Sequence, residues 1–356
     1  MEHYLISKKE NFLKDYSLHE KYKYDLSISG KMLAKYPRSL RFGGLLGKLD
    51  CYLDKDEEDK FLGVLEKRYS INKNNIILGP GANGILQNII KMLFVGPKLN
   101  LVTPFYTFHQ AVYGVNSLGC EVRYAKMEED FNVSINHILK SVNDNTKMIF
   151  LCNPNNPTGL VIKPEEIIAL AKSVKAYVVV SEASIEFSNT KSLLEYKLPS
   201  NIIVLRSFSK DFGLAGIRLG FAYASSSFKT QYLKHTPTNQ VGNVSLLIAN
   251  YALKNQKTIN KNISRVMTEV GYLQNALDAL DIPYLKSKSN SIMICRNINK
   301  EILRVLEEQD FKVTTVIGEN DELFIRIAVQ SRKINKLFIK KLKQLKEVYN
   351  ENFFSN

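Results

Sequence analysis

The most informative segment of the sequence is Arg206-Ser-Phe-Ser-Lys-Asp-Phe-Gly-Leu-Ala-Gly-Ile-Arg-Leu-Gly-Phe221. It follows the apolar run 202–205, which is typical of a buried strand. Its two serine hydroxyls and the guanidinium of Arg218 can hold one phosphate group between them. Lys210 would then lie beside whatever carries that phosphate. Nearby cations disfavour the charged form of a lysine and make its amine a better nucleophile. The alternative interpretation is an exposed loop lysine.

The sequence on both sides of this stretch alternates between short apolar runs and helical patterns, from about residue 74 to residue 225. We expect helices over 85–94, 108–118 and 164–173. Strands are expected at 76–78, 101–102, 121–124, 148–151, 177–180, 202–205 and 222–223. Such alternation predicts an α/β fold with a mainly parallel seven-stranded sheet and helices on both faces. Sheets of this kind bind ligands just beyond the carboxyl ends of their strands.

The pattern changes after residue 245 and predicts a smaller α+β domain. A long helical stretch reaches about residue 280. It is followed by strands at 291–295, 313–316 and 323–329, a helix at 300–309, and a terminal helix. We therefore expect an N-terminal arm (1–45) that forms part of the small domain, a large domain (46–245) and a small domain (246–356).

The net charge of +14 raises the question of a nucleic-acid partner. However, the lysines are spread along the chain. The densest run, 336–346, has apolar residues at helical spacing, which is typical of an amphipathic helix with a solvated face. We therefore expect no nucleic acid, and a basic surface that attracts small anionic metabolites.

The sequence also bears on location and metals. No apolar stretch is long enough to span a membrane, and the first residues lack the apolar core of a signal peptide. The four cysteines are scattered without metal-ligand spacing. We therefore expect a cytoplasmic protein with no membrane partner and no metal.

Two further loops follow predicted strands. Gly79-Pro-Gly-Ala-Asn-Gly84 precedes a helix, so its backbone N–H groups can approach a phosphate. A dinucleotide site would need an acidic residue about 20 positions later. The stretch 99–104 has none, which disfavours that interpretation, whereas a tight turn without a ligand stays open. Leu151-Cys-Asn-Pro-Asn-Asn-Pro-Thr-Gly159 is fixed by two prolines and a glycine, and it is either a rigid turn or a holder of amide side chains.

In this order and spacing, the segments 151–159 and 206–221 resemble fold-type-I enzymes that depend on pyridoxal 5′-phosphate (PLP), the class I and II aminotransferases. Within that class the chain is most similar to histidinol-phosphate aminotransferases and threonine-phosphate decarboxylases, over about residues 30 to 345. The resemblance implies a PLP cofactor and a homodimer.

The resemblance also implies a role for each matching residue. Lys210 would form the Schiff base with PLP and move the proton. Tyr106 would stack on the pyridine ring, and Asn156 would bond its phenolic oxygen. Tyr36 would reach the phosphate in the partner subunit, and Arg326 would bind the anionic group of the substrate. The cofactor phosphate would be held by Gly81, Ala82, Asn83, Ser207, Ser209 and Arg218.

One motif departs from the family. The family has Asp-Glu-Ala-Tyr where this chain has Ser181-Glu-Ala-Ser184. The aspartate pairs with the protonated pyridine nitrogen, whereas serine cannot stabilise a full positive charge. Glu182 is a poor substitute because adjacent strand residues point to opposite faces. Three explanations stay open: a weaker electron sink suited to the chemistry, an Asp-to-Ser mutation, or a protein that binds PLP with weakened catalysis.

Three functions therefore compete. The first is amino transfer on a small phosphorylated amino or oxo substrate. The second is decarboxylation of an amino-acid phosphate such as O-phosphoserine or O-phosphothreonine, which the segment 324–331 favours by its resemblance to decarboxylases. The third is PLP binding without turnover.

Overall fold

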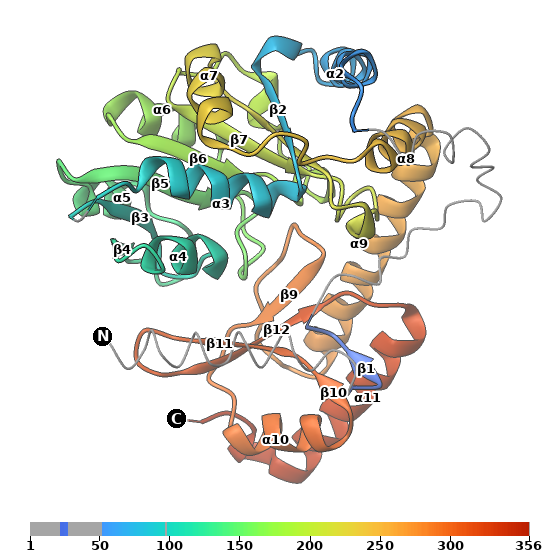
Figure 1. Cartoon of the computed structure of the whole chain (residues 1–356). Helices are drawn as coiled ribbons and strands as arrows, with labels where there is room; N and C mark the ends of the chain where they lie inside the picture. Colours follow the sequence, from blue (N-terminus) through green and yellow to red (C-terminus); the bar gives the residue numbers. More distant parts are fainter. Residues whose placement is uncertain (1–21, 28–51, 97, 356) are drawn as a thin grey trace.

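The computed structural model describes residues 22–27, 52–96 and 98–355, which form two packed units joined by a long helix, α9 (Gln256–Ala279) (Figure 1). The first unit is built on a seven-stranded sheet of order β2-β8-β7-β6-β5-β3-β4. Only β8 runs antiparallel to its neighbours in this sheet. The strands are β2 (Ile76–Gly79), β3 (Asn100–Pro104), β4 (Glu121–Ala125), β5 (Thr146–Cys152), β6 (Tyr177–Ser181), β7 (Ile202–Ser207) and β8 (Gly220–Tyr223). The expected strands and their mainly parallel arrangement are confirmed.

The central strands are apolar on both faces because helices cover both. Val178, Val179 and Val180 of β6 are all fully buried, and such β-branched runs are typical of strands inside a parallel sheet. One face packs against α3 (Gly81–Leu93), α4 (His109–Asn116) and α7 (Ser226–His235). The other packs against α2 (Lys55–Tyr69), α5 (Ile135–Ser141), α6 (Pro164–Ser173) and α8 (Asn243–Lys254).

The second unit is a smaller α+β assembly with its own core, and α9 packs into it. A three-stranded antiparallel sheet has the order β11-β12-β9. Its elements are β9 (Ser291–Ile294), α10 (Lys300–Glu308), β11 (Thr314–Ile317), β12 (Leu323–Ala328) and α11 (Arg332–Tyr349). In addition, β1 (Tyr24–Asp25) pairs with β10 (Phe311–Lys312), and Leu26 lies in the same core. Residues 24–26, near the start of the described chain, therefore pack in the core formed by its C-terminal elements.

The terminal helix α11 explains much of the lysine richness. Phe338, Leu342 and Leu345 are buried against the second core, whereas Lys336 and Lys343 are exposed. This is the amphipathic pattern expected from the spacing of the apolar residues. Among the helices of the described residues, none is both long and apolar enough to cross a membrane.

Two boundaries differ from the sequence-based expectation. The helical stretch after residue 245 breaks at Asn255, whose side chain bonds the carbonyl of Tyr251 and whose ψ of 51° leaves the helical region. The break lets α8 pack on the large sheet while α9 continues into the second core. Helix α3 begins at Gly81 rather than near residue 85, because a φ of +77° at this glycine turns the chain directly into the helix.

Candidate active site

The predicted site residues converge at one edge of the large sheet. Ser181 ends β6 between β5 and β7. Ser207 ends β7 opposite Gly220 of β8, and Gly220 pairs in turn with Gly79, the last residue before the turn into α3. The N-terminus of α3 therefore lies beside the carboxyl ends of the central strands. This edge is where sheets of this kind bind their ligands.

Close backbone packing forms a cradle at the start of α3. A Cβ on Gly220 would lie 2.5 Å from the backbone nitrogen of Ala82, and one on Gly81 would lie 3.0 Å from Nη2 of Arg218. Arg218 has a φ of +49°, and its Nη1 donates a hydrogen bond to the carbonyl of Ala215 at 3.0 Å. The first turn of α3, which includes Asn83, has no acidic residue. The free N–H groups and the guanidinium thus lie together, as an anion such as phosphate requires.

The serines of the Arg206–Phe221 stretch lie beside this cradle. The Oγ of Ser207 accepts a hydrogen bond from the backbone N–H of Ser209 at 3.0 Å. A hydroxyl can accept and donate at once, so Ser207 keeps its proton for another acceptor. Ser209 is half-buried one residue before Lys210. The hydroxyl of Ser207 therefore lies at the end of β7 beside the start of α3 with its proton available.

Lys210 has the electrostatic surroundings that the sequence predicted. Its side chain is half-buried, and among the described residues no carboxylate forms an ion pair with it. Burial first, and then the positive charges of Arg326 and Arg218, lower the pKa of Lys210 to about 8. About a tenth of the amine is thus uncharged at pH 7, far more than for an ordinary lysine, and the neutral form is the one that a nucleophilic lysine requires.

This pKa predicts how the capture of an aldehyde depends on pH. Only the neutral amine attacks a carbonyl, so the rate of aldehyde capture by Lys210 should fall about tenfold per pH unit below 8 and level off above 8. Stopped-flow absorbance of cofactor-free protein mixed with PLP measures this rate from pH 6 to pH 10. A rate that still rises tenfold per pH unit up to pH 10, as for an ordinary lysine with a pKa of 10.5, would show that neither burial nor the neighbouring arginines act on Lys210.

The loop after β5 is held by its own amides, which leaves one of them available. Asn153 bonds the N–H and carbonyl of Ile162, at 2.9 and 3.0 Å. Asn155 donates to the carbonyl of Tyr106 at 3.0 Å and to Thr158 at 3.1 Å. The side chain of Asn156 is half-buried and has no hydrogen-bond partner among the described residues. It is therefore the amide of this loop that can bond a ligand.

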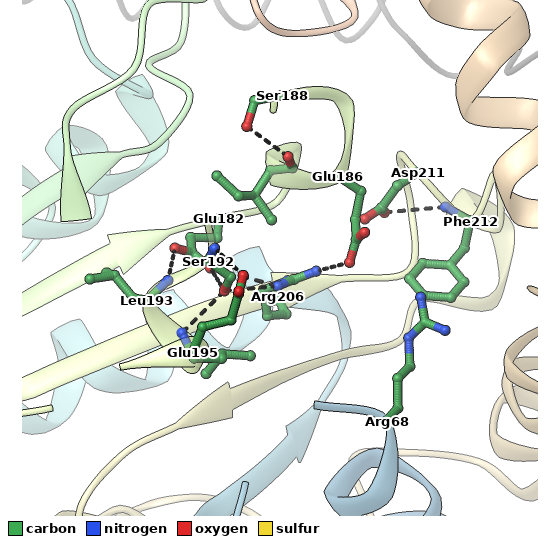
Figure 2. Close-up of polar contacts among 12 residues, drawn as sticks. Arg68, Glu182, Glu186, Ser188, Ser192, Leu193, Glu195, Arg206, Asp211 and Phe212 are labelled. Carbon is green, nitrogen blue, oxygen red and sulfur yellow. Dashed lines mark hydrogen bonds and ion pairs between the residues drawn. The ribbon is translucent and has the colours of Figure 1, made fainter. Parts of the chain in front are cut away.

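Ser181 and Glu182 point to opposite faces of the sheet, as strand alternation predicts. Glu182 is fully buried on the α2 side, where it accepts hydrogen bonds from the N–H of Leu193 at 2.8 Å and from the hydroxyl of Ser192, and pairs with Arg206 (Figure 2). The hydroxyl of Ser181 is half-buried and has no hydrogen-bond partner within the described part of the chain. Glu182 is thus committed elsewhere and cannot take the place of the missing aspartate.

Tyr106 lies where the two units meet. Its ring is 7% exposed and packs 5.5 Å from Phe131 and 6.2 Å from Phe324 of β12. Phe131 has a φ of +67°, which is unusual for a bulky residue and costs of the order of 1–3 kcal/mol. Aromatic contacts therefore join the loop after β3 to β12 of the second unit, the strand that carries Arg326. No pattern in the sequence pointed to Phe131.

Arg326 extends from β12 into the same region. Its Nε donates to Ser291 Oγ at 3.1 Å and its Nη1 donates to the carbonyl of Ser27 at 3.2 Å. No carboxylate of the described residues pairs with it, and burial lowers its pKa to about 10. An anionic ligand would supply the counter-charge that it lacks. Tyr36, the remaining predicted site residue, lies outside the described residues.

Comparison with known proteins agrees with this geometry. The family model described as aminotransferase class I and II matches residues 34–341. The chain belongs to this family: it is an enzyme of the aminotransferase class, and PLP is the cofactor of that class. Histidinol-phosphate aminotransferase of Clostridium novyi (strain NT) is 34% identical over 280 residues, which cover 76% of this chain and 78% of that relative. The enzyme of the same name from Clostridium kluyveri is 31% identical over 294 residues, covering 81% and 82%.

Solved structures show the same fold. The histidinol-phosphate aminotransferase from Sinorhizobium meliloti in complex with pyridoxal-5′-phosphate aligns with a TM-score of 0.82 at 19% identity, covering 91% of this chain and 90% of that one. The L-threonine-O-3-phosphate decarboxylase from Porphyromonas gingivalis aligns with a TM-score of 0.73 at 20% identity, covering 91% and 99%. The chain therefore has the fold-type-I architecture, and at these identities the structures establish the fold alone.

Proposed function

We propose that the protein is a PLP-dependent aminotransferase that acts on a small, phosphorylated amino or oxo substrate through Lys210. The observation that carries the proposal is the half-buried amine of Lys210, whose pKa is lowered by burial, Arg326 and Arg218. The names of the curated relatives state a phosphorylated substrate, which supports the same class of substrate for this chain.

The described residues fit PLP as the cofactor. The tight approach of Gly81 and Gly220 to Arg218 and Ala82 leaves no room for an additional side chain and keeps the backbone at the start of α3 beside the guanidinium, as a phosphate site would require. Tyr106 would present its ring to the pyridine, and Asn156 would bond the phenolic oxygen. The phosphate would be held by Gly81, Ala82, Asn83, Ser207, Ser209 and Arg218. When bound, PLP supplies an aldehyde that a primary amine attacks and a ring that withdraws electrons from the Cα of the substrate.

Lys210 has two tasks in this proposal. Its neutral Nζ would hold the cofactor through the aldehyde. Once the amine of the substrate has freed it, Nζ would accept the proton from the substrate Cα and return a proton later in the reaction. A pKa of about 8 suits both tasks, because the group exchanges protons readily near neutral pH.

Arg326 would bind the anionic group of the substrate, and its removal has a predicted cost. Arg326→Gln should raise KM for anionic substrates about 10- to 100-fold, since hydrogen bonds to charged groups contribute roughly 1.5–3 kcal/mol. The pKa of Lys210 should rise as well, because one of the cations that lower it is gone. Steady-state kinetics measure the first effect, and Arg304→Gln on the exposed face of α10 is the control. An unchanged KM would remove Arg326 from the substrate site.

Ser181 in the position of the aspartate weakens the electron sink in this proposal. A hydroxyl can bond a neutral ring nitrogen but cannot stabilise its protonated form as a carboxylate does. Of the three explanations for this residue, a weaker sink suited to the chemistry is the one we propose. The support is that the sequence retains Lys210, Asn156 and Arg218, which the resemblance to the family assigns to the active site.

Decarboxylation of an amino-acid phosphate, such as O-phosphoserine or O-phosphothreonine, is the second candidate. It is favoured by the resemblance of the segment 324–331 to decarboxylases. Release of carbon dioxide without an oxo acid would select it. The third candidate, PLP binding without turnover, requires that neither product forms.

The test of amino transfer is a half-reaction. Purified protein loaded with PLP is mixed with amino donors, histidinol phosphate and O-phosphoserine among them, and both the oxo product and pyridoxamine phosphate are measured. Formation of both in equal amounts supports the proposal. The absence of both with every donor contradicts it. The homodimer, the contribution of Tyr36 to the partner subunit and the cytoplasmic location remain predictions.

A further inference from the structure

A cluster of buried charges lies on the face of the large sheet opposite Ser181 (Figure 2). Arg206, one residue before Ser207 on β7, has a side chain that is 2% exposed. Its Nη2 lies 2.5 Å from Oε1 of Glu186, and its Nη1 lies 3.6 Å from Oε2 of Glu182 and donates to Ser192 Oγ at 3.2 Å. Burying a guanidinium is costly unless such partners surround it, so this arrangement holds Arg206 in one position.

The same cluster extends to the residue after Lys210. Asp211 is 2% exposed, and burial first, and then the carboxylate of Glu186, raise its pKa. Arg206 acts on Asp211 in the opposite direction, so both partners of the ion pair lie within electrostatic reach of Asp211. The cluster therefore includes Arg206, four residues before Lys210, and acts electrostatically on Asp211, one residue after it.

Two aromatic residues complete this support. The rings of Phe208 and Phe212 lie 4.7 Å apart and are buried in the same core. Within the turn, the N–H of Gly213 bonds the carbonyl of Lys210 at 3.1 Å. That bond shapes the turn but does not fix its position relative to the sheet. The N–H of Phe208 bonds the carbonyl of Leu219 at 3.1 Å, which ties the ends of the turn together beside β8, and the buried side chains on either side of Lys210 hold the turn against the core.

The geometry points to Glu186 as a positioning residue: through Arg206 it fixes the turn that presents Lys210, and thereby the distances from the Lys210 amine to Arg218 and Arg326. This inference rests on the proposed role of Lys210. Glu186 would touch neither cofactor nor substrate, because its carboxylate faces Arg206 on the other side of the sheet.

Glu186 is also the member of the cluster that can be changed without leaving a charge unpaired. Its side chain is 26% exposed and lines a cavity of about 670 Å³ together with Arg68, Tyr69 and Gln256. In Glu186→Gln, Arg206 keeps Glu182 as its buried counter-charge. Glu195→Gln is the matched control, because Glu195 lines the same cavity but bonds the N–H of Ser192 at 2.9 Å, which an amide oxygen can also accept.

The experiment compares Glu186→Gln, Glu195→Gln and the unchanged protein, each loaded with PLP. We expect Glu186→Gln to lower kcat about tenfold with KM for the amino donor within about twofold, because the bound substrate meets a displaced base. The amount of Lys210 that borohydride links to the cofactor should be unchanged. Glu195→Gln should match the unchanged protein throughout.

A second measurement does not depend on turnover. Competitive labelling with acetic anhydride, followed by mass spectrometry, gives the pKa of the Lys210 amine in cofactor-free protein. We expect Glu186→Gln to shift this pKa by about half a unit or more, because the amine moves relative to its two cations. The inference is overturned if that pKa does not move. It is also overturned if kcat falls only in proportion to the Lys210 that can be trapped, since the role would then be structural alone. Failure of amino transfer in the unchanged protein counts against the proposed function and leaves the labelling result to decide this inference.

Discussion

Replacing Lys210 with arginine should abolish covalent attachment of the cofactor and lower the rate of amino transfer by about 10⁴-fold, the upper end of what general acid–base catalysis contributes. Arginine keeps the positive charge and nearly the volume, so the burial and electrostatics of the site change little. Its guanidinium stays charged at every accessible pH and cannot act as a nucleophile or exchange protons. The loss would therefore report the chemistry of the amine rather than a failure to fold.

The measurement is a half-reaction rate together with the thermal midpoint of unfolding. Lys147→Arg, at an exposed position of β5, is the control for lysine-to-arginine exchange. Retention of more than about a hundredth of the activity in Lys210→Arg would mean that another group moves the proton.

Restoring the acidic residue at position 181 should have the second largest effect, in the direction of gain. Ser181→Asp should raise the rate of amino transfer about 10- to 100-fold, because a hydrogen bond to a charged partner contributes roughly 1.5–3 kcal/mol. Ser181 ends β6, and its hydroxyl is without a partner among the described residues, so a carboxylate there has no competing ion pair to satisfy.

Ser181→Asn separates charge from shape, since asparagine has the size of aspartate without its negative charge. Stopped-flow absorbance gives the rates, and the ¹⁵N chemical shift of labelled PLP reports whether the ring nitrogen carries a proton. If Ser181→Asp is no faster than Ser181→Asn, the carboxylate does not act on the ring, and the weaker electron sink is not what limits this enzyme. If both variants are inert, binding without turnover becomes the better description.

The sequence predicted those parts of the site that depend on local pattern. The alternation of apolar runs and helical patterns predicts which segments form the strands of the sheet. Ser181, Ser207 and Lys210 stand at or just after the ends of two of these strands, so the sequence also predicts the edge of the sheet at which they lie. Alternation along β6 also predicted that Glu182 would not share the surroundings of Ser181. These features follow from strand geometry and from the backbone conformations that glycine and proline favour. Both depend only on residues that are close together in the sequence.

The parts that could not be predicted depend on residues far apart in the chain. The carbonyl that orients Arg326 belongs to Ser27, 299 positions away. Asp211 follows a lysine in a polar stretch that is typical of an exposed turn. It is nevertheless buried, because the neighbouring side chains of Phe208 and Phe212 pack in the core. The pattern after residue 245 is helical throughout, and only the packing of α8 on the large sheet explains the break at Asn255.

In addition to burial, two arginines from different parts of the fold set the pKa of Lys210. Arg218 comes from the turn before β8 and Arg326 from β12 of the second unit, and both lower the pKa of the same amine. The two units must therefore be packed together, as they are here, for Lys210 to be most reactive. Bringing cations from two cores to one amine is a tertiary effect that the spacing of residues along the chain does not reveal.

Reduction of the PLP-loaded protein with borohydride, followed by proteolysis and mass spectrometry, shows which lysine carries the cofactor. We predict a single pyridoxyl group, attached to Nζ of Lys210 in the peptide that spans Arg206 to Arg218, and the loss of the visible absorption band on reduction. A pyridoxyl group on any other lysine, or no attachment at all, would contradict the assignment of Lys210 and the function built on it.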